Sequence, residues 1–220
     1  MRSKTFGIIA FVAAVSAAGA ASAADIYQPP PPIAPIYTPI SVYNWSGFYA
    51  GVSGGWGWGQ QTADTGTAFS GPITGGVLGA QAGYNYMFSN NIVLGVEADV
   101  SWTGQNGTVN PGPTVTQKLD WLGTARARLG YAMNNWMPYV TGGFAFGSGT
   151  RTTTAGGLSD TQTHTGYVLG AGIEWAFAQN WTAKLEYQYV NLGAKTYAIT
   201  AGPSVGMTDN IVKVGINYKF

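Results

Sequence analysis

The single histidine of the chain, His164, follows closely after Ser159 and Asp160. A serine, a histidine and an acidic residue can form a hydrolytic triad, in which the histidine takes the proton of the serine hydroxyl. An imidazole can also serve as an axial ligand of heme iron. A solvated loop histidine explains His164 with fewer assumptions, because nothing in the sequence aligns or buries these side chains. No cluster of metal-ligating residues is visible, so we expect no catalytic residue, no metal site and no cofactor.

Charged residues two positions apart form a second group that could do chemistry. Glu97 and Asp99 are separated by one alanine, and so are Arg126 and Arg128. In a β-strand this spacing places both charges on the same face. Such charges can line a polar path for solutes, or they can neutralise one another as ion pairs. Together with Glu174 and Lys213, which lack a charged neighbour at this spacing, six such residues give four positive and four negative charges: Glu97, Asp99, Arg126, Arg128, Glu174, Lys184, Glu186 and Lys213.

The C-terminal segment shows the kind of element that must position these charges. Every second residue from Val212 to Phe220 is apolar, and the residues between them are polar or small. A period of two is typical of a strand with one apolar face. The pattern recurs, and we predict eight strands at about residues 45–59, 75–88, 91–103, 117–132, 135–148, 164–178, 180–192 and 209–220. In the fifth of these, Pro138 lacks a backbone donor and Gly142-Gly143 suggests a bulge.

The connections between the predicted strands alternate between short and long. Those around residues 89–90, 133–134 and 178–180 are tight and contain asparagine, which tolerates turn geometry. The other connections, at about residues 60–74, 104–116, 149–163 and 193–208, are long and rich in Gly, Thr and Ser. This asymmetry is typical of an outer-membrane barrel, with short turns in the periplasm and long loops outside the cell. We therefore predict an all-β fold, an eight-stranded antiparallel transmembrane β-barrel.

The alternation also predicts which side chains face lipid. In the fourth strand, Leu119, Trp121 and Leu129 are expected on the lipid face. A Lys or Arg at the lipid midplane costs about 2–4 kcal/mol, so strand charges should face the lumen. A soluble lipocalin-type barrel would show the reverse pattern. Asp209 is assigned to a strand edge. We predict inward placement for eleven strand charges: Glu97, Asp99, Lys118, Asp120, Arg126, Arg128, Glu174, Lys184, Glu186, Lys213 and Lys219.

The N-terminal residues predict an exported protein. Arg2 and Lys4 precede an apolar run, and Ala21-Ser22-Ala23 is a small-residue cleavage site, so residues 1–23 are predicted to be a signal peptide. Residues 24–44 form a Pro-rich leader, a stiff spacer or a ligand for a periplasmic partner, and residues 45–220 form the barrel domain. Only 9% of residues are charged and there is no cysteine. Since removal of the signal peptide leaves 8 of 10 basic residues against 9 acidic ones, nucleic acid is not an expected partner.

The two ends of the predicted barrel resemble a known family. The segment from Tyr43 to Val52 after a Pro-rich leader, and the closing residues Ile216 to Phe220, are similar to those of the small outer-membrane immunogenic, or porin-family, proteins of Gram-negative bacteria. The architecture resembles the OmpA transmembrane domain. The resemblance implies location in the cell outer membrane, in contact with lipid and lipopolysaccharide. It also implies that Tyr218 and Phe220 form the signal read by the outer-membrane assembly machinery.

Three functions are compatible with such a barrel. An interior of eight strands is just wide enough for side chains to fill it, which favours a non-enzymatic structural and surface-antigen protein with a plugged lumen. In this plug Arg126, Arg128 and Lys213 would pair with Glu97, Glu174 and Glu186, and Asp99 would adjoin Lys184. The alternatives are a narrow diffusion porin and a loop-borne receptor or adhesin, for example for hemin. The sequence does not identify a loop ligand.

Overall fold

The computed structural model describes residues 43–63, 72–109, 115–153, 159–195 and 205–220. The predicted signal peptide and most of the predicted leader therefore lie outside the described residues, as do the central parts of the four predicted long loops. No helix among the described residues is long and apolar enough to cross a membrane.

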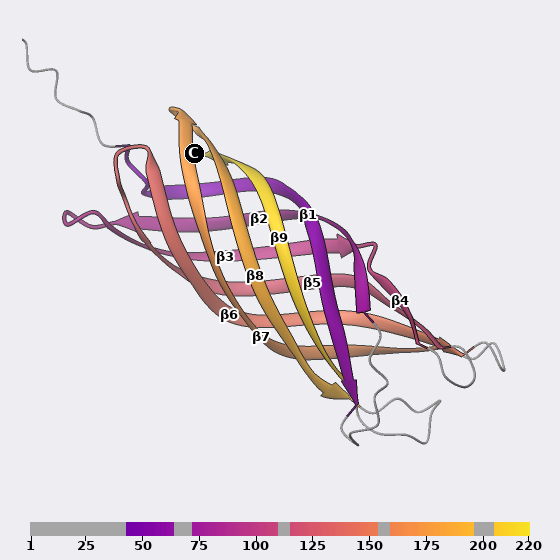
Figure 1. Cartoon of the computed structure of the whole chain (residues 1–220). Helices are drawn as coiled ribbons and strands as arrows, with labels where there is room; N and C mark the ends of the chain where they lie inside the picture. Colours follow the sequence, from indigo (N-terminus) through magenta and orange to yellow (C-terminus); the bar gives the residue numbers. More distant parts are fainter. Residues whose placement is uncertain (1–42, 64–71, 110–114, 154–158, 196–204) are drawn as a thin grey trace, which may run out of the picture. The chain divides into compact units, whose positions relative to one another are not determined.

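The described residues form one closed antiparallel sheet (Figure 1). Its strands are β1 (Gly47–Ala63), β2 (Pro72–Met87), β3 (Ile92–Thr103), β4 (Asn106–Val109), β5 (Val115–Tyr131), β6 (Trp136–Thr153), β7 (Ser159–Ala178), β8 (Trp181–Lys195) and β9 (Val205–Lys219). Strands β3 and β4 both pair with β2 and with β5, so together they occupy one position in the sheet. The barrel thus has eight positions, which confirms the predicted fold class.

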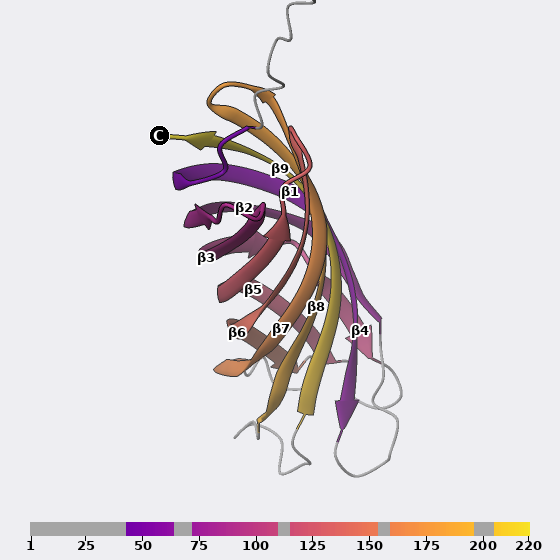
Figure 2. The ribbon, with the colours of Figure 1, turned by 90° about the vertical axis from the view of Figure 1, so that its left-hand side faces the viewer.

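Closure of the sheet depends on β1. This strand pairs with β2 along one edge and with β9 along the other, so the first and last strands are neighbours. The tilted strands wrap around a common interior in both ribbon views (Figures 1 and 2). Closure satisfies the backbone donors and acceptors within the sheet, which lipid cannot do.

The three tight turns occur where the sequence predicts them. Residues 89–90, 134–135 and 179–180 form turns between strands. Asn91 and Asn134 have φ angles of 64° and 56°, in the left-handed region that asparagine tolerates better than most residues. These turns define one end of the barrel, called here the turn end; the opposite end is the loop end.

The strands are longer at the loop end than the sequence predicts. Strand β1 continues to Ala63, and β6 and β7 extend to Thr153 and from Ser159, so the predicted loop boundaries are wrong by several residues. The reason is physical. Backbone pairing continues beyond the apolar band, but the outward residues there are mostly Thr, Gln and Asn, so the apolar alternation that predicts a strand has already ended.

The bulges lie elsewhere than predicted. Strand β6 pairs with β7 without a register shift at Gly142-Gly143, so the expected bulge there is wrong. The register instead shifts in β5 between Leu119 and Trp121. The extra residue, Asp120, reverses the inward and outward directions of the side chains that precede it. As a result Leu119 is buried, whereas Lys118 and Asp120 are exposed. The prediction that all three followed the regular alternation is therefore wrong.

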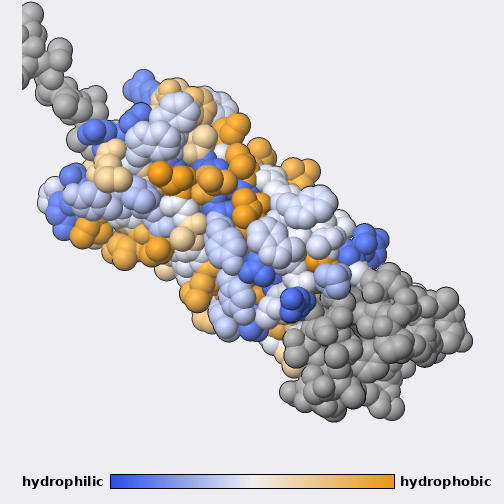
Figure 3. All heavy atoms as spheres, in the orientation of Figure 1, coloured by the Kyte–Doolittle hydropathy of each residue, from blue (hydrophilic) through white to orange (hydrophobic). Residues whose placement is uncertain are grey.

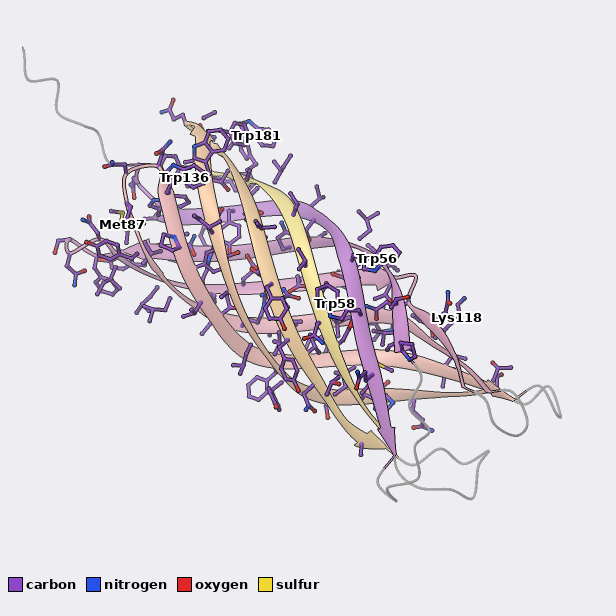
Figure 4. All side chains as sticks on the ribbon, viewed as in Figure 1. Trp56, Trp58, Met87, Lys118, Trp136 and Trp181 are labelled. Atoms are coloured by element: carbon purple, nitrogen blue, oxygen red, sulfur yellow. The ribbon has the colours of Figure 1, made fainter. Side chains whose placement is uncertain are left out.

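The outer surface of the barrel is apolar and aromatic. Phe48 and Leu78 are 66% and 65% exposed, as predicted for lipid-facing positions. Apolar side chains lie across the strands on the face seen in Figure 3. Trp136 and Trp181 lie towards the turn end, and Trp56 and Trp58 lie towards the loop end (Figure 4). These belong to two aromatic girdles of the kind that marks the membrane interfaces.

We predict that the folded protein migrates faster than the boiled protein in SDS gels. A closed sheet has no edge from which detergent can begin to unravel it, so the unheated barrel stays compact. Far-UV circular dichroism of the same sample should show β-sheet. Identical migration before and after boiling, together with a helical spectrum, would contradict the fold.

Candidate functional site

The interior of the barrel contains three layers of buried side chains. Strand β8 shows the order of two of these layers. Its buried residues Lys184 and Glu186 are charged, and its buried residues Val190 and Leu192, further towards the loop end, are apolar. The inner cluster, at the turn end, consists of Trp45, Val93, Ala132, Met137 and Ala176, with Tyr43 and Met87 packed against it. The outer cluster, at the loop end, consists of Ile73, Val77, Leu119, Leu122, Ala145, Val168, Val190, Leu192, Met207 and Ile211. Between these clusters lies the charge layer, which consists of eight of the eleven charged residues predicted to face the lumen: Glu97, Asp99, Arg126, Arg128, Glu174, Lys184, Glu186 and Lys213.

Arg126 is the centre of the charge layer. Its guanidinium forms ion pairs with Glu97 and Glu186, and Nη2 lies 3.1 Å from Oδ2 of Asp99. Strand β5 carries Arg126, and Glu97 is its direct register partner on β3. The Arg126 side chain is only 1% exposed, so protein carboxylates replace the water that would otherwise solvate the cation.

Two lysines complete the compensation of these carboxylates. Lys184 Nζ lies 3.0 Å from both carboxylate oxygens of Glu97 and 4.0 Å from Glu186. Lys213 Nζ donates to Asp99 at 3.1 Å and to the Ser101 hydroxyl at 3.1 Å. Each carboxylate around Arg126 therefore has a lysine within 4.0 Å.

Arg128 and Glu174 form a second, more isolated part of the layer. They make an ion pair with each other, and it is the one ion pair of either residue in the described part of the chain. The Arg128 guanidinium lies 3.6 Å from the centre of the Tyr139 ring, a cation–π contact. Glu174 also accepts hydrogen bonds from Thr182 and, at 3.0 Å, from Asn217.

Two tyrosines that donate hydrogen bonds to the charge layer are not among the residues predicted to line the lumen. Tyr49 donates its hydroxyl to Glu97 at 2.8 Å, and Tyr139 donates to Glu186 at 2.7 Å. Both are buried. Their positions carried a usable signal, since Tyr49 shares the inward face with Ser53 and lies next to the outward Phe48. A tyrosine on the polar face of a strand indicates a hydroxyl that donates a hydrogen bond to another side chain in the lumen.

The observed pairs agree only partly with the predicted ones. The structure brings all eight predicted charges together, and Arg126–Glu97 and Arg128–Glu174 are among the expected combinations. Asp99, however, pairs with Lys213 and Arg126, whereas Lys184 pairs with Glu97. Asp209, predicted at a strand edge, is instead buried in the lumen. The stagger between strands determines these combinations, and residue spacing along one strand does not contain it.

The candidate triad is not assembled. Ser159 and His164 lie five residues apart on β7, so the period of two places them on opposite faces. His164 is buried, and its Nδ1 lies 3.1 Å from the carbonyl oxygen of Gly193, whereas Ser159 is exposed. Within the described residues, no group of three or more His, Asp or Glu side chains is placed to hold a metal ion.

The segment before β1 packs into the turn end of the barrel. Trp45 is 2% exposed within the inner cluster, and its ring contacts Tyr43 edge-on at 4.8 Å. Lys219 donates to the carbonyl oxygen of Asn44 and lies 4.7 Å from the centre of the Tyr43 ring. At the same end, Phe220 donates its backbone N–H to Phe48 at 2.9 Å and exposes its ring outward. Tyr218 is also on the outer face, at 39% exposure.

Comparison with known proteins gives a consistent result. Residues 10–220 match the family described as outer membrane protein beta-barrel domain. The 31 kDa outer-membrane immunogenic protein of Brucella melitensis is 34% identical over 251 residues, covering 100% of both chains. A 22 kDa outer membrane protein of Rhizobium leguminosarum is 36% identical, over 80% of this chain and 79% of its own.

A solved structure, that of the outer membrane protein OprG of Pseudomonas aeruginosa, has the same kind of fold. It aligns with a TM-score of 0.50 and 14% sequence identity, over 80% of this chain and 97% of its own. At this identity the likeness concerns the fold alone.

Replacing Arg126 by alanine should lower the free energy of unfolding by about 3–5 kcal/mol, because it leaves three buried carboxylates without their shared cation. Lys118→Ala is the matched control, since Lys118 is exposed on the neighbouring part of the same strand. We expect that change to stay within about 0.5 kcal/mol. Equilibrium unfolding in urea from lipid vesicles measures both. Equal effects of the two substitutions would contradict the ion-pair network.

Proposed function

Because this chain belongs to the family of outer membrane protein beta-barrel domains, we propose that it is a non-enzymatic structural and surface-antigen protein whose lumen is closed to solutes. It is located in the outer membrane. The observation that carries the proposal is the charge layer, in which every member has an oppositely charged partner within 4.0 Å.

The balance of the charge layer supports a plug and disfavours an ion path. Four cations face four anions, whereas a selective pore would carry an excess of one sign. Arg126 alone engages three carboxylates, so these oxygens are occupied by protein donors. A permeating ion would have to break these pairs and would gain no vacant ligand in return.

The two apolar clusters support the same proposal. Leu122, Val168 and Ile211 each have 0% exposure in the outer cluster. Trp45, Val93 and Met137 fill the turn end. Apolar side chains in close contact exclude water, so a solute would have to pass two dry layers and one ion-paired layer. This arrangement is less favourable for the alternative function, a narrow diffusion porin.

The surface-antigen part of the proposal comes from relatives. Proteins of Brucella that are 34% identical over the full length of this chain are named outer-membrane immunogenic proteins. We predict that four segments lie outside the cell: those between β1 and β2, between β4 and β5, between β6 and β7, and between β8 and β9. The alternative of a loop-borne receptor has no specific support in the described residues.

The non-enzymatic part rests on the arrangement of the polar residues. His164 and Ser159 face opposite sides of β7, so they do not cooperate in proton transfer. The carboxylates of the charge layer are engaged in ion pairs and hydrogen bonds within the closed interior. A substrate would have no access to them without disrupting the barrel.

Planar-bilayer recording tests the closed lumen directly. We expect the wild-type protein to show no steady, large conductance, because three buried layers block the interior. Arg126→Ala should increase brief leak events, since it removes the cation that joins three strands across the charge layer. Lys118→Ala should behave like the wild type. A steady wild-type conductance that Arg126→Ala leaves unchanged would contradict a closed lumen and favour a narrow diffusion porin.

A further inference from the structure

A buried carboxylate at the loop end of the lumen stands apart from the charge layer. Asp209 on β9 is 1% exposed, and Gln105, from the break between β3 and β4, has 0% exposure. The Gln105 side-chain amide donates to Asp209 Oδ2 at 2.8 Å. In the closed sheet, β1 and β2 lie between the two segments that this contact joins. We call it the Gln105–Asp209 clasp.

Asp209 forms no ion pair with a cation of the described residues. None of the ion pairs in that part of the chain includes Asp209. The nearest lysine on its own strand, Lys213, is paired with Asp99. Asp209 Oδ1 and the side-chain oxygen of Gln105 accept no hydrogen bond from the described residues. With Asp209 ionised, the buried lumen would hold five carboxylates against four cations.

The clasp occupies space that two glycines leave free. A methyl group added at Gly57 of β1 would overlap the Gln105 amide nitrogen, and one added at Gly59 would lie 3.1 Å from Asp209 Oδ1. Both side chains therefore lie directly against the β1 backbone. This fit indicates that the clasp is a specific part of the fold.

The side chains around the clasp are mostly apolar. Val190 of β8 is the register partner of Asp209, and Met207 and Ile211 flank it on the inward face of β9. Strands β2 and β5 contribute Ile73, Val77, Leu119 and Leu122 to the same outer cluster. The charged group that acts on Asp209 is Lys213 of the same strand, which is itself paired with Asp99. On β7, His164 is buried and contacts the Gly193 carbonyl.

The clasp lies beyond the lipid-facing band. Asp209 lies one residue beyond the row of Trp58, Tyr189 and Asn210, which belongs to the outer girdle. The next row towards the loop end, Gln60, Asn191 and Thr208, is entirely polar. Outside the membrane-spanning segment, burial raises the pKa of the Asp209 carboxyl to about 6, although the Gln105 hydrogen bond, a hydrogen bond from the Asn210 backbone and the charge of Lys213 oppose the shift. Burial without an ion-paired cation favours the neutral acid.

We propose that the Gln105–Asp209 clasp is a proton-binding site that keeps the loop end of the lumen closed. While Asp209 carries a proton, the clasp places no net charge in the apolar cluster. Ionisation puts an uncompensated carboxylate there, and the cluster loosens to let water reach it. Gln105 lies in the short connection between β3 and β4 (Figure 1), and its backbone carbonyl accepts a hydrogen bond from the Leu119 N–H at 3.3 Å. The proposal does not depend on whether the lumen conducts.

The test compares wild type and Asp209→Asn by the midpoint of thermal unfolding in detergent. The variant keeps an acceptor for Gln105 and cannot ionise. A carboxyl whose pKa is raised by folding stabilises the folded state at low pH, and this contribution is lost as the pH rises through the raised value. Between about pH 4.5 and about pH 8 we expect the wild-type midpoint to fall relative to the variant by about 5 °C.

Two controls make the result decisive. Asp120→Asn changes an exposed carboxylate that accepts a hydrogen bond from Thr150, and its difference from wild type should not vary over this pH range. Infrared spectra of wild-type protein labelled in aspartate should show a protonated carboxyl band at about pH 5.5, where exposed aspartates are ionised. A pH-independent difference between wild type and Asp209→Asn, or the absence of that band, would overturn the proposal.

Discussion

The structure depends on one constraint: a closed sheet in lipid gives every strand one apolar face and one narrow interior face. A Lys or Arg at the lipid midplane costs about 2–4 kcal/mol, so a charge within the lipid-facing part of a strand must turn inward. Inside, an eight-position barrel leaves room for side chains and little else. A buried cation without a partner is strongly unfavourable, so inward charges are stable only when they are paired. The same alternation that shields the strands from lipid thus creates the charge layer of Arg126 and its neighbours.

The three interior layers combine different interactions for one result. The ion pairs of the charge layer join β3, β5, β7, β8 and β9 across the lumen. Arg126 reaches Glu97 and Glu186, Arg128 reaches Glu174, and Lys213 reaches Asp99. Apolar clusters on either side exclude water, which strengthens these electrostatic interactions. At the turn end Trp45 fills the mouth from a segment outside the strands. At the loop end the outer cluster encloses Asp209, whose charge has no cation beside it.

Much of the fold follows from the period of two, and the departures have physical causes. The eight positions, the tight turns and the inward facing of Glu97 or Arg126 could be predicted because apolar and charged residues alternate clearly there. Lys118 and Leu119 were misassigned because one extra residue in β5 reverses the alternation, and no composition signal marks it. Which charges pair was unpredictable, since strand stagger determines it.

The most direct test of mutual compensation is a double-mutant cycle on Arg128 and Glu174, the most isolated ion pair of the layer. The three variants are Arg128→Met, Glu174→Gln and the double substitution, each measured by equilibrium unfolding in the same lipid. Each single change leaves one buried charge unpaired, whereas the double change removes both, so the double variant should be more stable than the sum of the singles predicts. We expect a coupling free energy of about 2 kcal/mol or more. Additivity within about 0.5 kcal/mol would mean that water solvates each charge separately, which would contradict a closed, ion-paired lumen.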